Sequence, residues 1–211
     1  MPEQSKKRTQ KKYFDPISMA ARTHQVVHRV EEHDKMAMLE YVIKNSQMKR
    51  TAIVCKSKKK ADELGTYLNK DSVKVKVIHG NHRKSDQETV AQAFISGEIN
   101  QLITTDKVLQ QLELTNIERI IYLDTPIEAD NYFKSLAFVD EKGELISLLS
   151  SQEEGLFSVI EILLKIEIPD VEVEGFVFSE PVVEEKVDKD KKKKVRHRLQ
   201  KGDKIKSKAK P

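Results

Sequence analysis

Cysteine is nearly absent from this sequence, and long apolar stretches are absent altogether. The 211 residues contain one cysteine, Cys55, which excludes an internal disulfide framework and favours a reducing compartment. No apolar run approaches the ~18 residues that a membrane span needs, and residues 1–12 are polar and basic. We therefore expect neither a signal peptide nor a membrane helix, and we expect the protein to reside in the cytoplasm.

Charge is distributed unevenly along the chain. Residues 1–12 carry a net charge of +4, residues 186–211 carry +10, and the part between them carries −10. Blocks of like charge are typical of disordered segments that meet polyanions. We therefore predict an acidic globule between a basic arm (residues 1–20) and a disordered Lys/Arg-rich tail (residues 179–211). A tail that only improves solubility would have the same composition.

Between the two arms, patterns typical of strands alternate with patterns typical of helices. Short apolar or alternating runs predict strands at residues 25–30, 51–55, 73–80, 101–105, 117–124 and 143–150. Amphipathic stretches predict helices at residues 31–45, 56–70, 85–97 and 151–164. This alternation predicts a single α/β domain (21–178) with a mostly parallel sheet and helices on both faces. Because such sheets bind ligands at the carboxyl ends of their strands, residues 104–106 mark a candidate site.

Capping residues predict where several helices begin. Side chains that accept hydrogen bonds from a helix N-terminus precede the helical stretches at Asp34, Ser85, Asp106 and Ser151. Both serines are followed three residues later by a glutamate, as in a capping box. Gly97 is a typical helix stop.

Five segments occur in an order that is far more specific than any one of them. They are TAIVCKSKKKADELGTYL (51–68), VIHGNHRKSDQETVAQAF (77–94), LITTDKVLQQLEL (102–114), IERIIYLDTPIEADNYF (117–133) and ISLLSSQEEGLFSVIEILLKIEIP (146–169). This order resembles the second, C-terminal RecA-like domain of a DEAD-box RNA helicase. The first segment is similar to motif IV of that family, the third to motif V, and the fourth to the approach to motif VI. The resemblance covers residues 21–176 and implies a RecA-like fold.

The same resemblance indicates what this chain lacks. The sequence contains neither G-x-x-x-x-G-K-[ST] nor Asp-Glu-Ala-Asp, which in the family belong to the first domain. Lys134, Ser135 and Phe138 stand where motif VI has a histidine and arginines, and residues 110–113 (QQLE) replace the Arg-Gly-x-Asp of motif V. An arginine finger is worth about 10³ to 10⁵ in rate. We therefore predict that this chain alone is not an enzyme and uses no cofactor.

The positions that contact RNA in the family differ less from the family pattern than the ATP-site positions do. The resemblance implies contacts to the RNA backbone by Ser57, Lys58, Gly80, Lys84, Thr104, Thr105 and Asp106. A glycine lets a backbone amide approach a phosphate closely, and a lysine retains the positive charge of the family's arginine as a point charge. Two structural alternatives stay open. The Thr-Thr-Asp stretch could serve only as a helix cap, and the lysine run at residues 56–60 could be a solvated helix face.

The C-terminal tail offers further basic residues, Lys192, Lys193, Arg196 and Arg198, without interleaved aromatic residues. Contacts of this kind bind phosphates without reading the nucleotide sequence. The first hypothesis is therefore a non-catalytic protein that binds the RNA backbone through its globule and its tail.

Two other hypotheses follow from the same resemblance. The chain could be a protein-interaction module that docks on a helicase or a ribosomal protein, with Leu136 and Phe138 in an apolar patch. It could also be the C-terminal part of an ATP-dependent RNA helicase that another chain completes. His79 and His82 have the spacing of a metal pair, but no further ligand is suitably spaced, so we expect no metal. Cys55 lies in an apolar run and is expected to be a buried, inert thiol.

Overall fold

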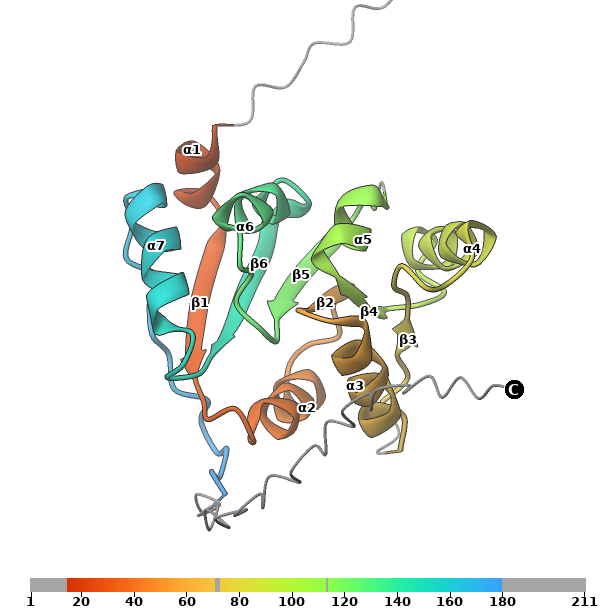
Figure 1. Cartoon of the computed structure of the whole chain (residues 1–211), viewed down its shortest axis with the longest axis horizontal. Coiled ribbons are helices and arrows are strands. Elements are labelled where there is room, and N and C mark those ends of the chain that lie inside the picture. The colour runs from red at the N-terminus through yellow and green to blue at the C-terminus, as the bar shows by residue number, and fades with distance from the viewer. Residues whose placement is uncertain (1–14, 71–72, 113, 180–211) are drawn as a thin grey trace, which may run out of the picture. The chain divides into compact units, whose positions relative to one another are not determined.

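The computed structural model describes residues 15–70, 73–112 and 114–179, without the side chains of residues 140–142. Six parallel strands form one open sheet in the order β1-β6-β5-β2-β4-β3 (Figure 1). Their bounds are His24–Arg29 (β1), Thr51–Cys55 (β2), Lys76–Val77 (β3), Gln101–Thr105 (β4), Ile117–Tyr122 (β5) and Val139–Leu149 (β6). The predicted α/β fold with a parallel sheet is confirmed.

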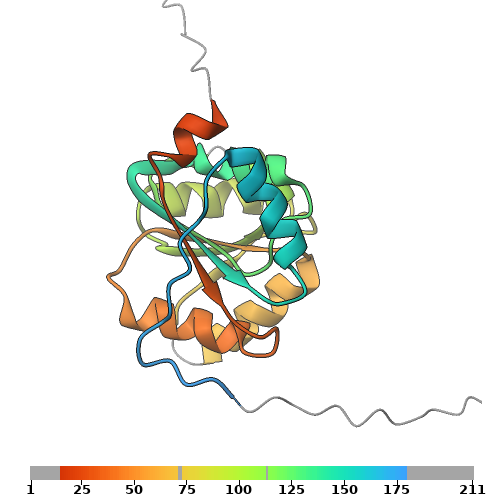
Figure 2. The same cartoon turned by 90° about the vertical axis from the view of Figure 1, so that its left-hand side faces the viewer.

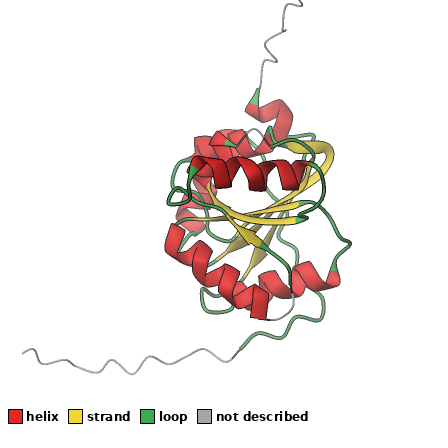
Figure 3. Ribbon diagram, turned by 90° about the vertical axis from the view of Figure 1, so that its right-hand side faces the viewer, coloured by secondary structure: helices red, strands yellow, loops and turns green. Residues whose placement is uncertain are grey.

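Helices cover both faces of this sheet (Figure 3). They are α1 (Pro16–Ala20), α2 (Lys35–Asn45), α3 (Lys58–Lys70), α4 (Lys84–Ile95), α5 (Asp106–Gln111), α6 (Ala129–Leu136) and α7 (Glu154–Leu164). Strand β2 explains the two layers, because all five of its residues are buried. Ala52 and Val54 belong to one apolar cluster, whereas Ile53 and Cys55 belong to the other. A strand that is buried on both faces carries apolar residues at successive positions rather than at alternate ones.

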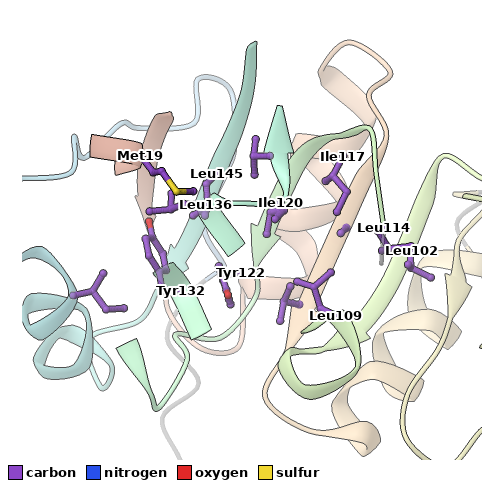
Figure 4. Packing of buried hydrophobic residues seen from close by; sticks show 14 of the residues in the cluster. Met19, Leu102, Leu109, Leu114, Ile117, Ile120, Tyr122, Tyr132, Leu136 and Leu145 are labelled. Carbon is purple, nitrogen blue, oxygen red and sulfur yellow. The ribbon is translucent and has the colours of Figure 1, made fainter. Parts of the chain in front are cut away.

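Membership in the two apolar clusters shows which face of the sheet each helix covers. Apolar residues of α2 and α3, such as Leu39 and Leu64, pack on the Ile53 face. The other face is covered by α1, α4, α5, α6 and α7, and Figure 4 shows part of that cluster around Tyr122 and Tyr132. The two tyrosine rings stack with their centroids 5.5 Å apart. The tyrosine hydroxyls find partners in Ser135 and Gln25, as buried hydroxyls require.

The segment after α7 returns along β1, the first strand of the sheet order (Figure 2). Val27 donates its amide to the Pro169 carbonyl and accepts from the Val171 amide, both at 2.9 Å. These bonds occupy backbone groups that an edge strand otherwise leaves open. The chain then reaches α2, where Phe176 meets the Tyr41 ring edge to face with centroids 5.7 Å apart.

None of the four predicted caps forms a side-chain hydrogen bond to its helix, and Asp106 is described with the site below. Ser85 lies inside α4, which begins after Arg83 without a side-chain cap. Ser151 does not cap α7, which begins after Glu153, and the Glu153 carboxylate accepts bonds from Ser150 instead. Asp34 does precede α2, but its carboxylate accepts from the amide and hydroxyl of Ser179 rather than from the helix. The Asp34 cap failed because a tertiary partner, Ser179, occupies its carboxylate. Gly97 does end α4, with φ of +82°.

Within the described residues, no helix combines the length and apolarity that crossing a membrane requires.

Candidate nucleic-acid interface

The carboxyl ends of β2, β4 and β5 meet at one edge of the sheet. Cys55 pairs with Thr105 and Val54 pairs with Tyr122, so the loops that follow these strands lie side by side. An open groove of about 1290 Å³ lies at this edge. It is lined by Lys56, Ser57, Lys58, Lys59, Gly80, His82, Lys84, Gln87, Thr105, Asp106, Lys107, Val108, Gln110, Gln111, Pro126, Ile127, Glu128, Asn131 and Lys134.

The structure brings together most of the residues that the sequence singled out. Those that line the groove are Ser57, Lys58, Gly80, Lys84, Thr105 and Asp106. Thr104 does not line it, because this side chain is fully buried in β4 and its hydroxyl has no hydrogen-bond partner. Residues 192, 193, 196 and 198 of the tail lie outside the described residues, as does Glu113.

Positive charge dominates the groove. It is lined by six lysines against two carboxylates, Asp106 and Glu128. Three of the lysines, Lys56, Lys59 and Lys134, form ion pairs with acids outside the lining, whereas Lys58, Lys84 and Lys107 form none with any described residue. Lysine ammonium groups in an open groove attract phosphates, and a nucleic acid that binds them releases the counterions condensed on it. Lys107 was missed at the sequence level, because a single lysine in a short helix gives no signal until the fold places it beside the others.

The turn after β3 is held from two sides. Gln87 donates to the His82 carbonyl at 3.0 Å, and His79 lies 2.9 Å from Asp62 through its Nε2 atom. A Cβ atom at Gly80 would lie 3.5 Å from Cε of Lys58, in ordinary contact. Lys58 in turn donates to Asn81 at 2.7 Å. The turn therefore sets the position of Lys58, while Lys84 stays exposed at the start of α4.

The lysine run at residues 56–60 has two parts, one that faces the groove and one that forms internal ion pairs. Ser57 accepts the Lys60 amide at 3.1 Å and so caps α3, whose start faces the groove. Lys58 and Lys59 are exposed there. Lys60 turns inward and binds Asp124 and Glu32. Burial opposes the charged form of Lys60, but these two hydrogen bonds outweigh burial and raise its pKa above the ordinary value. The interpretation of the run as a solvated face is wrong for Lys60.

Three carboxylates converge behind the groove. The carboxylates of Glu32, Asp124 and Glu153 lie close enough to share a cation. No other group of acidic, histidine or cysteine side chains among the described residues does so. The ammonium of Lys35 is already among them, 3.2 Å from Glu32, 4.0 Å from Asp124 and bonded to Glu153. Burial opposes ionisation of Glu32, but hydrogen bonds from Lys60 and Lys35 outweigh it and lower its pKa. The group is therefore an internal ion-pair network that joins three loops.

Asp106 does not cap α5 but is its first residue. Its carboxylate accepts a hydrogen bond from the Tyr122 hydroxyl at 3.1 Å, and that hydroxyl also contacts Ser135 at 2.8 Å. Burial raises the pKa of Asp106 to about 6, and the charges of Asp124 and Glu128 add to this while the Tyr122 bond opposes it. Asp106 is thus an acid that titrates within the groove.

The predicted apolar patch is not at the surface. Leu136 is 1% exposed and packs in the core beside Leu145 (Figure 4), and Phe138 is partly buried against the same cluster. Instead, Ile127 is exposed beside the groove. Cys55 is buried, as expected, and burial raises the pKa of its thiol to about 12.

A parallel sheet whose carboxyl edge carries a motif IV strand end, a His-Gly turn and a Thr-Thr-Asp defines the RecA-like domains of helicases. The family model for the helicase conserved C-terminal domain matches residues 34–137. The ATP-dependent RNA helicase DDX4 of Mus musculus is 27% identical over 108 residues, which are 51% of this chain and 15% of that relative. The chain therefore spans only a small part of such relatives.

Solved structures show the same fold. The C-terminal domain of the DEAD-box protein Dbp5 aligns with a TM-score of 0.68 at 19% identity, over 72% of this chain and 92% of that domain. Dbp5 of S. cerevisiae bound to RNA and ADP BeF3 aligns with a TM-score of 0.66 at 21% identity, over 72% of this chain and 42% of that one. Residues 34–137 thus match the helicase conserved C-terminal domain, and the fold is that of the C-terminal RecA-like domains of DEAD-box proteins.

Proposed function

We propose that this chain is a non-catalytic protein that binds the backbone of RNA without sequence preference. The observation that carries the proposal is the groove at the carboxyl edge of the sheet, with its six lysines. Its core would be the predicted contacts Ser57, Lys58, Gly80, Lys84, Thr105 and Asp106. The tail beyond residue 180 would add phosphate contacts, and the cytoplasm is the proposed place of action.

Two features support RNA over other polyanions. The groove combines amine donors with hydroxyl and amide groups, such as Thr105 and Asn131, that suit sugar and phosphate oxygens. In addition, a solved neighbour of the same fold, Dbp5, holds RNA.

The absence of arginine from the groove supports a role without ATP hydrolysis. A guanidinium fork that neutralises charge on the transferred phosphoryl group accelerates hydrolysis by about 10³ to 10⁵. The groove lining contains lysines alone as cations besides His82. Ser135, which stands at a motif VI arginine position, is fully buried and bonded to Tyr122. It therefore cannot reach a ligand in the groove.

Removing two groove lysines, in the variant Lys58→Ala with Lys84→Ala, should weaken binding to a generic single-stranded RNA. Each phosphate neutralised contributes about 0.7 to the slope of log K against log salt, so the slope should fall by about 1.4. Fluorescence anisotropy of the full chain across a salt series measures both quantities.

The matched control is Lys70→Ala with Lys74→Ala. It removes the same charge from exposed lysines at the far end of α3 and the segment after it, on the opposite edge of the sheet. If both double variants lose affinity equally, only net charge matters and the groove is not the site. The RNA affinity of a chain that ends at Pro181 then measures how much the tail contributes to binding. If none of these proteins binds RNA, the proposal is refuted.

A protein-interaction module is the second candidate. Single exposed aliphatic residues are ordinary on protein surfaces, but Ile127 lies within the groove, where a protein partner that docks there would contact it. Solved neighbours of this fold were determined with protein partners, among them E. coli SrmB with RraA. Ile127→Lys would add charge to the groove, so it should strengthen RNA binding under the first proposal and abolish partner binding under the second.

A further inference from the structure

Helix α7 is apolar on almost its whole circumference. Phe157, Ile160 and Leu164 face the core and are buried. On the other side, large aliphatic residues are exposed in a stripe at Leu156, Val159, Ile162 and Leu163. Their exposed fractions reach 49% for Val159 and 73% for Ile162. A helix that is hydrophobic all round is normally covered on all sides, so this stripe calls for a partner.

The described residues leave the stripe uncovered. Helix α7 lies at the margin of the domain, next to α1 (Figure 1). Two charged segments of this chain are unsuited to cover it by composition. Residues 1–12 carry charges and polar groups, and residues 186–211 spread a few aliphatic residues among 13 basic ones. Neither offers the continuous apolar face that four aliphatic side chains require.

We infer that the α7 stripe is the contact between two copies of this chain, which pack their α7 helices antiparallel about a two-fold axis near Val159. Such an interface must be self-complementary, because each copy presents the same patch to the other. With the axis at Val159, Leu156 of one copy lies opposite Ile162 of the other, and Gly155 lies opposite Leu163. The glycine leaves room for the leucine, since nothing lies within 4 Å of a Cβ placed there.

Charge supports the antiparallel arrangement. The N-terminal end of α7 carries the half-exposed Glu154, which pairs with Arg29, whereas Glu153 is held inward by Lys35. The C-terminal end of α7 is followed by Lys165. Lys165 is exposed and forms no ion pair with any described residue, so its ammonium is available. An antiparallel pair brings each Lys165 to the acidic end of the other copy, whereas a parallel pair would place like charges together.

The dimer would leave the RNA-binding groove free, because no residue of α7 lines it. Two grooves in one particle would raise avidity for a long strand without any new contact. The inference does not depend on RNA binding, and its test is separate.

Light scattering coupled to size-exclusion chromatography should give the full chain a mass of about twice 24.3 kDa. Ile162→Glu should reduce this to the mass of one chain, since it would bury a charge against an apolar face. Met48→Glu is the matched control, because Met48 is also highly exposed but lies after α2. It should leave the dimer intact.

The single buried cysteine allows a second test. In Val159→Cys, a short bis-maleimide should link two copies, since the introduced thiols would face each other across the axis while Cys55 is inaccessible. Met48→Cys should stay unlinked. A wild-type mass of one chain at all concentrations, or linking that is equal in the two cysteine variants, would overturn the inference. The cysteine variants also decide the matter if Ile162→Glu fails to fold.

Discussion

Replacing Lys35 by methionine should lower the free energy of unfolding by about 3–5 kcal/mol, the usual cost of breaking a buried ion pair from one side. The Lys35 side chain is fully buried and its ammonium contacts Glu32, Asp124 and Glu153. Methionine keeps the apolar length of the side chain and removes only the charge. The loss would leave Glu153 without its cation, whereas Glu32 and Asp124 would keep Lys60. Urea denaturation followed by circular dichroism measures it.

Lys44→Met is the control on the same helix. Lys44 forms an exposed pair with Glu40, one turn earlier. Pairs of this kind contribute about 0.3–0.5 kcal/mol, so the variant should be nearly as stable as the parent. Equal losses in the two variants would mean that the buried network contributes no more than a surface pair.

Asp106→Asn should stabilise the protein near neutral pH by about 1–3 kcal/mol. Burial raises the pKa of the Asp106 carboxyl from an ordinary 3.8 to about 6. A tenfold change in an ionisation constant corresponds to about 1.4 kcal/mol, and the open side of the groove reduces the full effect. Asparagine carries no charge and can still accept the bond from Tyr122.

The gain should depend on pH in a defined direction. A carboxyl whose folded pKa is raised favours the folded state below its ordinary pKa, and that contribution disappears as the pH rises through the folded pKa. The wild-type chain therefore loses stability between pH 3.8 and about 6, and the asparagine variant does not. The advantage of the variant should be largest above pH 6 and should vanish below pH 3.8. Unfolding of both proteins across this range tests it.

Asp86→Asn serves as the comparison, since Asp86 is exposed in the first turn of α4. It should show no gain that grows with pH. A destabilising Asp106→Asn would contradict the prediction, since asparagine keeps an acceptor for the Tyr122 hydroxyl and removes only the buried charge. A stabilising one would fit a residue kept for binding at a cost in stability, which is common at functional sites.

The sequence predicted the six strands and most of the helices in order, because these depend on local chemistry, but it did not predict α1 or α6. The buried strand at residues 51–55 reads as apolar at every position, and the amphipathic spacing in residues 56–70 marks α3. Caps were less predictable. Asp34 and Glu153 have the right chemistry for helix ends, but Ser179 and Lys35 compete for them across long sequence separations.

The candidate site, too, could be predicted from the sequence only in part. Local sequence and family resemblance determined which residue types stand at the strand ends, among them Ser57, Gly80, Thr105 and Asp106. Only the tertiary structure decided which of them face the groove. In the structure Thr104 is buried, Lys60 points inward and Lys107 lines the groove. The direction of each side chain depends on how the strands pair and on which charged group lies nearest in space. The tertiary structure likewise buried Leu136 and left the stripe on α7 exposed, which no helical period in the sequence could reveal.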